Sequence, residues 1–173
     1  MISREADSAA VILGIDPGTA ITGYAVVSEE HAGLALRADG VIRTPADLPL
    51  SRRLLTIHRD LCSIIEQHRP TALAVEKVFF SKNVRTALAV GHARGVVLLS
   101  AAMYDLPVFE YGPNEVKQAI SGYGGADKRQ VQQMVTLLLN LEEVPQPDDA
   151  ADAIAVAICH LHTARWQQLA ESG

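Results

Sequence analysis

Positive charge, cysteine and long apolar runs are all scarce in this sequence of 173 residues, which has a net charge of −5. The two cysteines, Cys62 and Cys159, are too few for a disulfide-bonded scaffold, and we expect both to be buried, reduced thiols. The longest apolar runs, at 96–99 and 154–159, are far shorter than the roughly 20 residues that span a bilayer. Charged residues interrupt the first ten positions, where a signal peptide would be apolar. These absences favour a cytoplasmic protein with no membrane partner.

The length and composition favour a single globular domain. Apolar residues make up 49% of the chain and charged residues 20%, which is typical of an ordinary folded protein. Repeats, low-complexity tracts and linkers are missing from the sequence. We therefore expect one domain at 11–166, with an N-terminal extension at 1–10 and a short tail at 167–173.

The low positive charge counts against a nucleic-acid partner, but its distribution matters more than its total. The segment 77–129 contains seven basic and four acidic side chains, so it carries +3 while the remainder of the chain carries −8. Several of the remaining acids are candidate metal ligands, and bound cations would offset their charge. The composition thus permits nucleic-acid binding on one face.

The hydrophobic pattern predicts three strands, then a helix, a strand, a helix, a strand and further helices. Two tight connections join the first three strands into an antiparallel meander, and helices lead into the other two. We expect an α/β fold in which helices cover a mixed, five-stranded sheet. The expected strands lie at 10–15, 22–28, 34–44, 72–75 and 107–111, and the expected helices at 47–68, 83–104, 113–120, 127–140 and 148–166.

Two acidic residues follow buried strands. Asp16 stands between an apolar strand and Pro17-Gly18, and Glu76 ends the run Ala-Leu-Ala-Val-Glu. Asp16 could be an ordinary turn residue, and Glu76 an exposed residue at a strand end. Functional groups gather at strand ends in sheets of this kind, so both are also candidates for chemistry.

A third acidic group opens the last expected helix. Asp149 and Asp152 are three residues apart, which places them on one helix face together with apolar positions. Acids in a first turn suit the helix dipole, and this explains Asp148 well. It explains Asp152 poorly, because that residue lies beyond the first turn. An acid on the apolar, buried face of a helix costs folding free energy unless a cation or hydrogen bonds compensate its charge.

Together the four acids predict an oxygen-rich metal site. Carboxylate oxygens suit Mg²⁺ or Mn²⁺, whereas zinc would need a set of Cys and His ligands with suitable spacing. We expect His160 and His162 to be solvated or locally hydrogen-bonded. A pair of carboxylate-held Mg²⁺ ions suits phosphodiester hydrolysis, because one ion activates water and the other stabilises the leaving oxygen.

Six short motifs, in unbroken order over about residues 11–162, resemble the RuvC family of Holliday junction resolvases. Each motif alone is weak, and the six in sequence are highly specific. They are GIDPGTAITGYA at 14–25, AVEKVFFSKN at 74–83, GHARG at 91–95, PVFEY at 107–111 with VKQ at 116–118, DKRQVQ at 127–132 and DAADA at 149–153.

The resemblance implies an RNase H-like α/β/α sandwich and a set of four catalytic acids that bind Mg²⁺ or Mn²⁺, two ions per subunit. The spacing D-x-x-D favours Asp149 over Asp148 in that set. Asp148 could instead cap the helix or assist the four acids. Lys117 and Lys128 match basic residues needed for cleavage, and Phe79 matches an aromatic residue near the junction crossover. The four acids are Asp16, Glu76, Asp149 and Asp152.

On this basis we interpret the protein as an endonuclease that resolves four-way DNA junctions in recombination and repair. Lys128 would stabilise phosphate charge in the transition state. The resemblance also implies a homodimer, whose symmetry suits a four-way junction, with the branch-migration proteins RuvA and RuvB as partners. The basic residues expected to position the DNA backbone are Lys82, Arg85, Lys117, Lys128 and Arg129.

Three other interpretations remain open. The pattern D-x-G-x-x-x-T-G at 16–23 also resembles the phosphate-binding turn of actin-like and sugar-kinase-like ATPases, but those folds need two such lobes. A catalytically inactive junction-binding module would not need the intact acid set. A related RNase H-like nuclease could act on RNA instead of DNA.

Overall fold

The computed structural model describes residues 9–77 and 84–171. The element order matches the expected one throughout these ranges. The strands are β1 (Val11–Asp16), β2 (Ile21–Glu30), β3 (Gly33–Arg43), β4 (Ala72–Glu76) and β5 (Val108–Tyr111), and the helices are α1 (Leu50–His68), α2 (Val84–Met103), α3 (Pro113–Ser121), α4 (Lys128–Leu138) and α5 (Asp148–Glu171).

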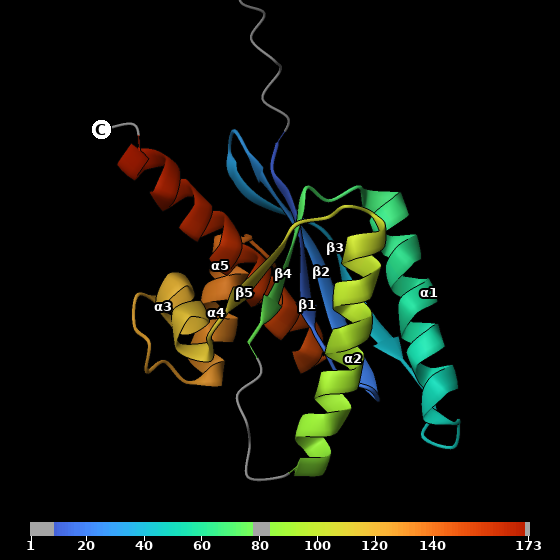
Figure 1. Ribbon diagram of the computed structural model, residues 1–173. Helices are drawn as coiled ribbons and strands as arrows, with labels where there is room; N and C mark the ends of the chain where they lie inside the picture. The colour runs from blue at the N-terminus through green and yellow to red at the C-terminus, as the bar shows by residue number, and fades with distance from the viewer. Residues whose placement is uncertain (1–8, 78–83, 172–173) are drawn as a thin grey trace, which may run out of the picture.

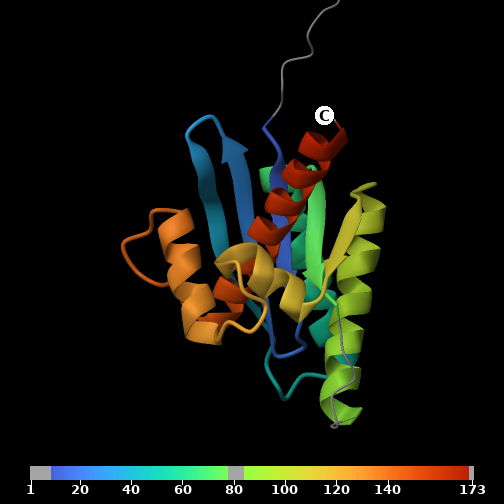
Figure 2. The same cartoon turned by 90° about the vertical axis from the view of Figure 1, so that its left-hand side faces the viewer.

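The five strands form one mixed sheet in the order β3-β2-β1-β4-β5. β1 pairs antiparallel with β2, and β2 pairs antiparallel with β3, as the short connections require. β4 is parallel to both of its neighbours, because helices carry the chain between these strands. Helices α1 and α2 cover one face of the sheet, and α3, α4 and α5 cover the other (Figures 1 and 2). The predicted α/β sandwich with a five-stranded mixed sheet is confirmed.

Each face of the sheet has its own hydrophobic core. Neighbouring residues of β1 point to opposite faces, so Ile12 joins one core and Leu13 joins the other. Ile12 packs with the buried face of α5, which includes Ile154 and Ile158. Leu13 packs with Leu61 of α1 and with α2. Because both faces of β1 and β4 are covered, their sequences are continuous apolar runs rather than alternating ones.

Helix α5 lies unusually close to the sheet, at two glycines. A Cβ on Gly14 would lie 2.1 Å from the backbone oxygen of Ala153, and one on Gly23 would lie 1.9 Å from the backbone oxygen of Asp149. Real Cβ atoms do not approach other atoms so closely. Side chains at these two positions would therefore push the first turns of α5 away from β1 and β2.

Two helix boundaries differ from the expected ones by three residues or more. α1 begins at Leu50 rather than near residue 47, because Pro49 has an extended backbone and precedes the first helical turn. α5 continues to Glu171 rather than ending at Trp166, since the residues that follow are good helix formers without a proline.

In the described part of the chain, α2 is long and apolar enough to cross a membrane by length and composition. Its residues Ala93 and Val97 are nevertheless buried in the core beside α1.

We expect Gly14→Ala to destabilise the protein, because the added methyl group has no space between β1 and α5. Overpacking of this kind costs about 1–3 kcal/mol and lowers Tm by about 2–4 °C per kcal/mol in a chain of this size. Thermal unfolding followed by circular dichroism measures the effect.

Gly124→Ala is the matched control, because an added Cβ there meets its nearest atom at 3.5 Å, an ordinary contact. Its Tm should stay equal or rise slightly, since alanine restricts the unfolded chain more than glycine does. An unchanged Tm for Gly14→Ala would contradict the close packing of α5.

Candidate active site

Two of the predicted acids end neighbouring parallel strands. Asp16 is the last residue of β1, and Glu76 is the last residue of β4. The pairing Ile15↔Val75 precedes them, so the two acids follow in register at the same edge of the sheet. This is the edge where the carboxyl ends of parallel strands meet and where α/β proteins place their functional groups.

The other two acids come from the first turns of α5. Gly23 pairs with Asp16 across the β1–β2 ladder, and the backbone of Asp149 lies directly against Gly23. The close contact therefore fixes the start of α5 beside Asp16. Asp152 follows three residues later, on the same side of the helix.

Electrostatic coupling shows that the four carboxylates share one region. Burial, together with the charges of Asp152, Asp149 and Glu76, raises the pKa of Asp16 to about 7. Burial and the charge of Asp152 likewise raise the pKa of Glu76. Burial raises the pKa of Asp152, against the opposing effect of Lys128. Such a cluster of partly buried, mutually repelling acids favours a bound cation.

Lys128 supplies one positive charge to the cluster. It is the first residue of α4, and the side chain of Asp127 caps this helix by accepting a hydrogen bond from the Gln130 amide at 2.8 Å. The Lys128 Nζ lies 3.1 Å from Oδ2 of Asp152 and 3.1 Å from Oδ2 of Asp148. Burial lowers the pKa of Lys128, but the hydrogen bonds and charges of the two aspartates outweigh it and raise the pKa overall.

The donor set fits a hard divalent cation, because all four acids present carboxylate oxygens. Among the residues that the structure describes, however, no three His, Cys, Asp or Glu side chains converge closely enough to hold one ion as they stand. The carboxylate oxygens stand apart because the acids repel one another and because Asp152 pairs with Lys128. The predicted ligand set of Asp16, Glu76, Asp149 and Asp152 therefore stays a prediction.

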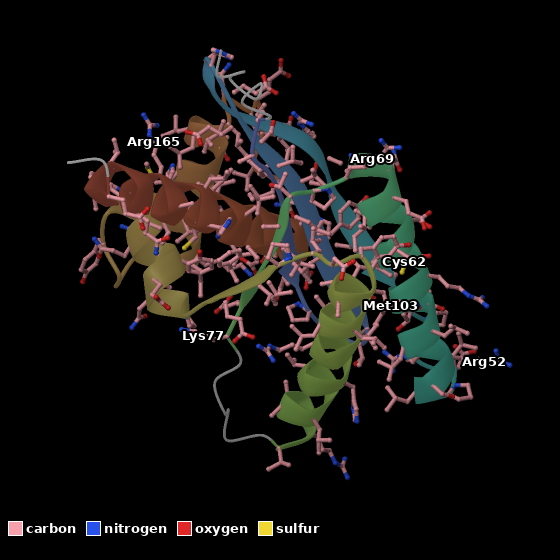
Figure 3. The ribbon with its side chains drawn as sticks, turned by 45° about the horizontal axis from the view of Figure 1, so that its top comes forward. Arg52, Cys62, Arg69, Lys77, Met103 and Arg165 are labelled. Atoms are coloured by element: carbon pink, nitrogen blue, oxygen red, sulfur yellow. The ribbon has the colours of Figure 1, made fainter. Side chains whose placement is uncertain are left out.

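A cleft opens beside the acids, between the end of β4 and helices α3, α4 and α5. Acidic and basic side chains both line it: Glu76 and Asp152 face Lys117 and Lys128. The charge of Lys117 lowers the pKa of Glu76, against the larger effect of burial. Lys77 follows Glu76 at the end of β4, and its Nζ lies 3.5 Å from Oε2 of Glu115 at the start of α3 (Figure 3).

The remaining predicted residues are more scattered. Arg129 is exposed in the first turn of α4, next to Lys128, and Arg85 is exposed in the first turn of α2. Phe79 and Lys82 lie outside the described residues. His160 is buried with its Nδ1 2.7 Å from the hydroxyl of Tyr111, which confirms the expectation of a locally hydrogen-bonded histidine.

Sequence reasoning missed two contributors to the site. Gly23 was part of a motif, but nothing in the sequence shows that a helix lies against it. Gln132 donates a hydrogen bond from Nε2 to Oδ1 of Asp148 at 3.1 Å. Its spacing of four residues from Lys128 is the signal that would have placed both side chains on one face of α4.

Comparison with known proteins agrees with these observations. Residues 12–160 match the family model described as crossover junction endodeoxyribonuclease RuvC. The chain is 58% identical over 156 residues to the RuvC crossover junction endodeoxyribonuclease of Heliobacterium modesticaldum, covering 90% of this chain and 96% of the relative. It is 55% identical over 161 residues to the protein of the same name from Roseiflexus sp., covering 93% and 96% of the two chains.

Solved structures show the same likeness. The structure of Thermus thermophilus RuvC in complex with a Holliday junction substrate matches with a TM-score of 0.87 and 38% identity, over 91% of this chain and 96% of that one. The yeast mitochondrial Holliday junction resolvase Ydc2 matches with a TM-score of 0.66 and 13% identity, over 94% of this chain and 86% of that one, and so shares the fold. The sequence motifs, the arrangement of acids at the sheet edge and these matches together place the chain in the RuvC family of crossover junction endodeoxyribonucleases.

Proposed function

We propose that this protein is a metal-dependent endonuclease that resolves four-way DNA junctions by paired phosphodiester hydrolysis. The observation that carries the proposal is the meeting of Asp16, Glu76 and the start of α5 at one edge of the sheet, in a chain of this family. A related protein, T. thermophilus RuvC, has been solved with a Holliday junction substrate. Recombination and DNA repair, in the cytoplasm, are the processes that present such junctions.

Each acid has a proposed role in this reaction. Asp16 is electrostatically coupled to the other three acids, and together with Glu76, Asp149 and Asp152 it would hold the Mg²⁺ or Mn²⁺ ions, two per subunit. Such ions activate a water molecule and stabilise the leaving oxygen in phosphodiester hydrolysis. Lys128, whose ammonium group lines the cleft, would stabilise the negative charge that develops on the phosphate.

The DNA backbone would lie across the cleft and the surfaces beside it. Lys117 lines the cleft, and Arg129 is exposed next to Lys128, so both can contact phosphates near the acids. Arg85 would contact DNA farther away, at the start of α2. Phe79 and Lys82 keep the roles that the family resemblance implies, respectively at the junction crossover and on the backbone.

We propose that two copies associate through the exposed face of α2. Large apolar side chains are exposed along this helix, including Leu88 at 54% and Leu99 at 58%. A Cβ on Gly91 or Gly95 would meet nothing within 4 Å, so a second helix could approach closely there. The start of α2 lies at the same end of the molecule as the ends of β1 and β4 (Figure 1), so a dimer could present two sites to one junction. The family resemblance supports RuvA and RuvB as further partners.

Cleavage of a labelled four-way junction tests the proposed function. The wild-type protein should cut two opposed strands in Mg²⁺ or Mn²⁺ and cut nothing in excess EDTA, because the acids require a cation to act. Linear duplex, RNA–DNA hybrid and ATP serve as competing substrates. Preferred cleavage of the hybrid, or hydrolysis of ATP, would overturn the proposal, as would full junction cleavage in EDTA.

Asp16→Asn is the control variant for this assay. The change keeps the size of the side chain and removes one charge from the acid cluster, so cleavage should fall by at least about 100-fold. Junction binding should stay within about twofold, because other residues contact the phosphates. A mobility-shift titration measures the binding. Binding without cleavage by the wild-type protein would indicate an inactive junction-binding module.

Leu88→Glu should weaken the dimer at least about tenfold, because it places a charge where Leu88 would bury its side chain. Sedimentation equilibrium measures the dissociation constant, and circular dichroism checks that the fold is kept. Leu137→Glu is the matched control, since Leu137 is 72% exposed on α4, on the opposite face of the sheet. Equal effects of both substitutions, or none from Leu88→Glu, would contradict the proposed interface.

A further inference from the structure

We infer that Asp148 is a positioning residue, which holds the ammonium group of Lys128 at the cleft and does not itself bind the metal. This inference rests on the proposed function, since it assigns Asp148 a part in the same site. The sequence alone leaves Asp148 as a helix cap, an assisting acid or an alternative to Asp149.

The contacts of Asp148 form a bridge between two helices. Lys128 and Gln132 are four residues apart on α4, and Asp148 and Asp152 are four residues apart on α5, so each pair shares one helix face. Both oxygens of Asp148 have partners: Oδ1 accepts from Gln132 at 3.1 Å, and Oδ2 lies 3.1 Å from the Lys128 Nζ. The same Nζ lies 3.1 Å from Asp152, so the lysine is shared by both acids.

The surroundings of Asp148 differ from those of the proposed metal ligands. Asp148 is exposed, and Asp152 lines the cleft whereas Asp148 does not. Hydrogen bonds from Lys128 and Gln132 lower the pKa of Asp148, while burial raises that of Asp152. Asp16 is coupled to Asp152 and Asp149 but shows no such coupling to Asp148. Asp148 is thus compensated by its neighbours on α4: its charge contributes to the raised pKa of Asp152, but both of its oxygens have direct partners, and it has no such effect on Asp16.

This arrangement has a consequence for Lys128. A cation that engages the carboxylate of Asp152 competes with the lysine for the same oxygens. The second ion pair, with Asp148, then keeps the ammonium group beside the cleft. Without Asp148, Lys128 would have Asp152 as its remaining partner at this position. The lysine would then compete more strongly with the cation for Asp152. Once the cation displaced it, the ammonium group would be held less firmly beside the cleft.

A double-mutant cycle on metal binding tests the inference. Mn²⁺ binding is measured by calorimetric titration without DNA, in wild type, Asp148→Asn, Lys128→Met and the double variant. Asp148→Asn should raise the Mn²⁺ dissociation constant about two- to fivefold, the range expected for an exposed ion pair. In the Lys128→Met background the loss should be clearly smaller, because only the direct attraction between the Asp148 carboxylate and the cation remains, and salt weakens that attraction.

Two results would overturn the inference. An equal loss of affinity in both backgrounds would show that Asp148 acts on the cation directly, and no change in either would show that it does not position Lys128. Glu143→Gln removes an exposed charge from the loop before α5 and should leave the affinity unchanged. A loss as large as that of Asp148→Asn would assign the effect to general charge and would also overturn the inference.

Cleavage provides a second readout. At saturating Mn²⁺ and junction, Asp148→Asn should lower the single-turnover rate about two- to fivefold without changing junction affinity. Asp148→Glu keeps the charge and should restore at least half of the rate; a failure to do so would contradict the positioning role. If the wild-type protein binds Mn²⁺ but cuts no junction, the proposed function fails while the binding cycle still decides the role of Asp148.

Discussion

The backbone of α5 lies against β1 and β2 at two positions where the chain has no side chain. The contact at Gly23 is the more important one for function, because Gly23 pairs with Asp16 and touches the backbone of Asp149. A strand-end acid and a helix-start acid are thereby fixed beside each other by main-chain packing. The site thus depends on a rigid contact between helix and sheet, which holds the acids against their mutual repulsion.

The burial of these acids and their mutual repulsion have a cost in stability. The pKa of Asp16 in the folded protein, about 7, lies above its ordinary value of 3.8, so the folded state holds this proton more tightly than the unfolded state does. Stability contributed by the protonated acid is therefore present below pH 3.8 and is lost as the pH rises through about 7. Lys128 offsets part of the charge through Asp152, and a bound cation would offset more.

Much of the fold and of the site could be predicted from the sequence, for identifiable physical reasons. Continuous apolar runs that end at Asp16 and Glu76 mark buried parallel strands, and functional groups gather at the carboxyl ends of such strands. The spacing of Asp149 and Asp152 shows that they share a helix face. The roles of Gly23 and Gln132 could not be predicted, because both depend on which elements pack together. α5 extends beyond the expected end at Trp166, since residues 167–171 contain no proline or glycine that would stop the helix.

We propose that one subunit's sheet edge and α5 supply a complete set of catalytic acids. A mixed dimer of one wild-type subunit and one Asp16→Asn subunit, purified with two different tags, tests it most directly. Scoring the products of a four-way junction under single-turnover conditions distinguishes a nick in one strand from full resolution. The mixed dimer should nick one strand and leave the opposed strand intact. Full resolution at the wild-type rate would contradict this assignment, because one site would then have to make both cuts. A complete loss of cleavage would also contradict it, because the site would then have to be shared between subunits.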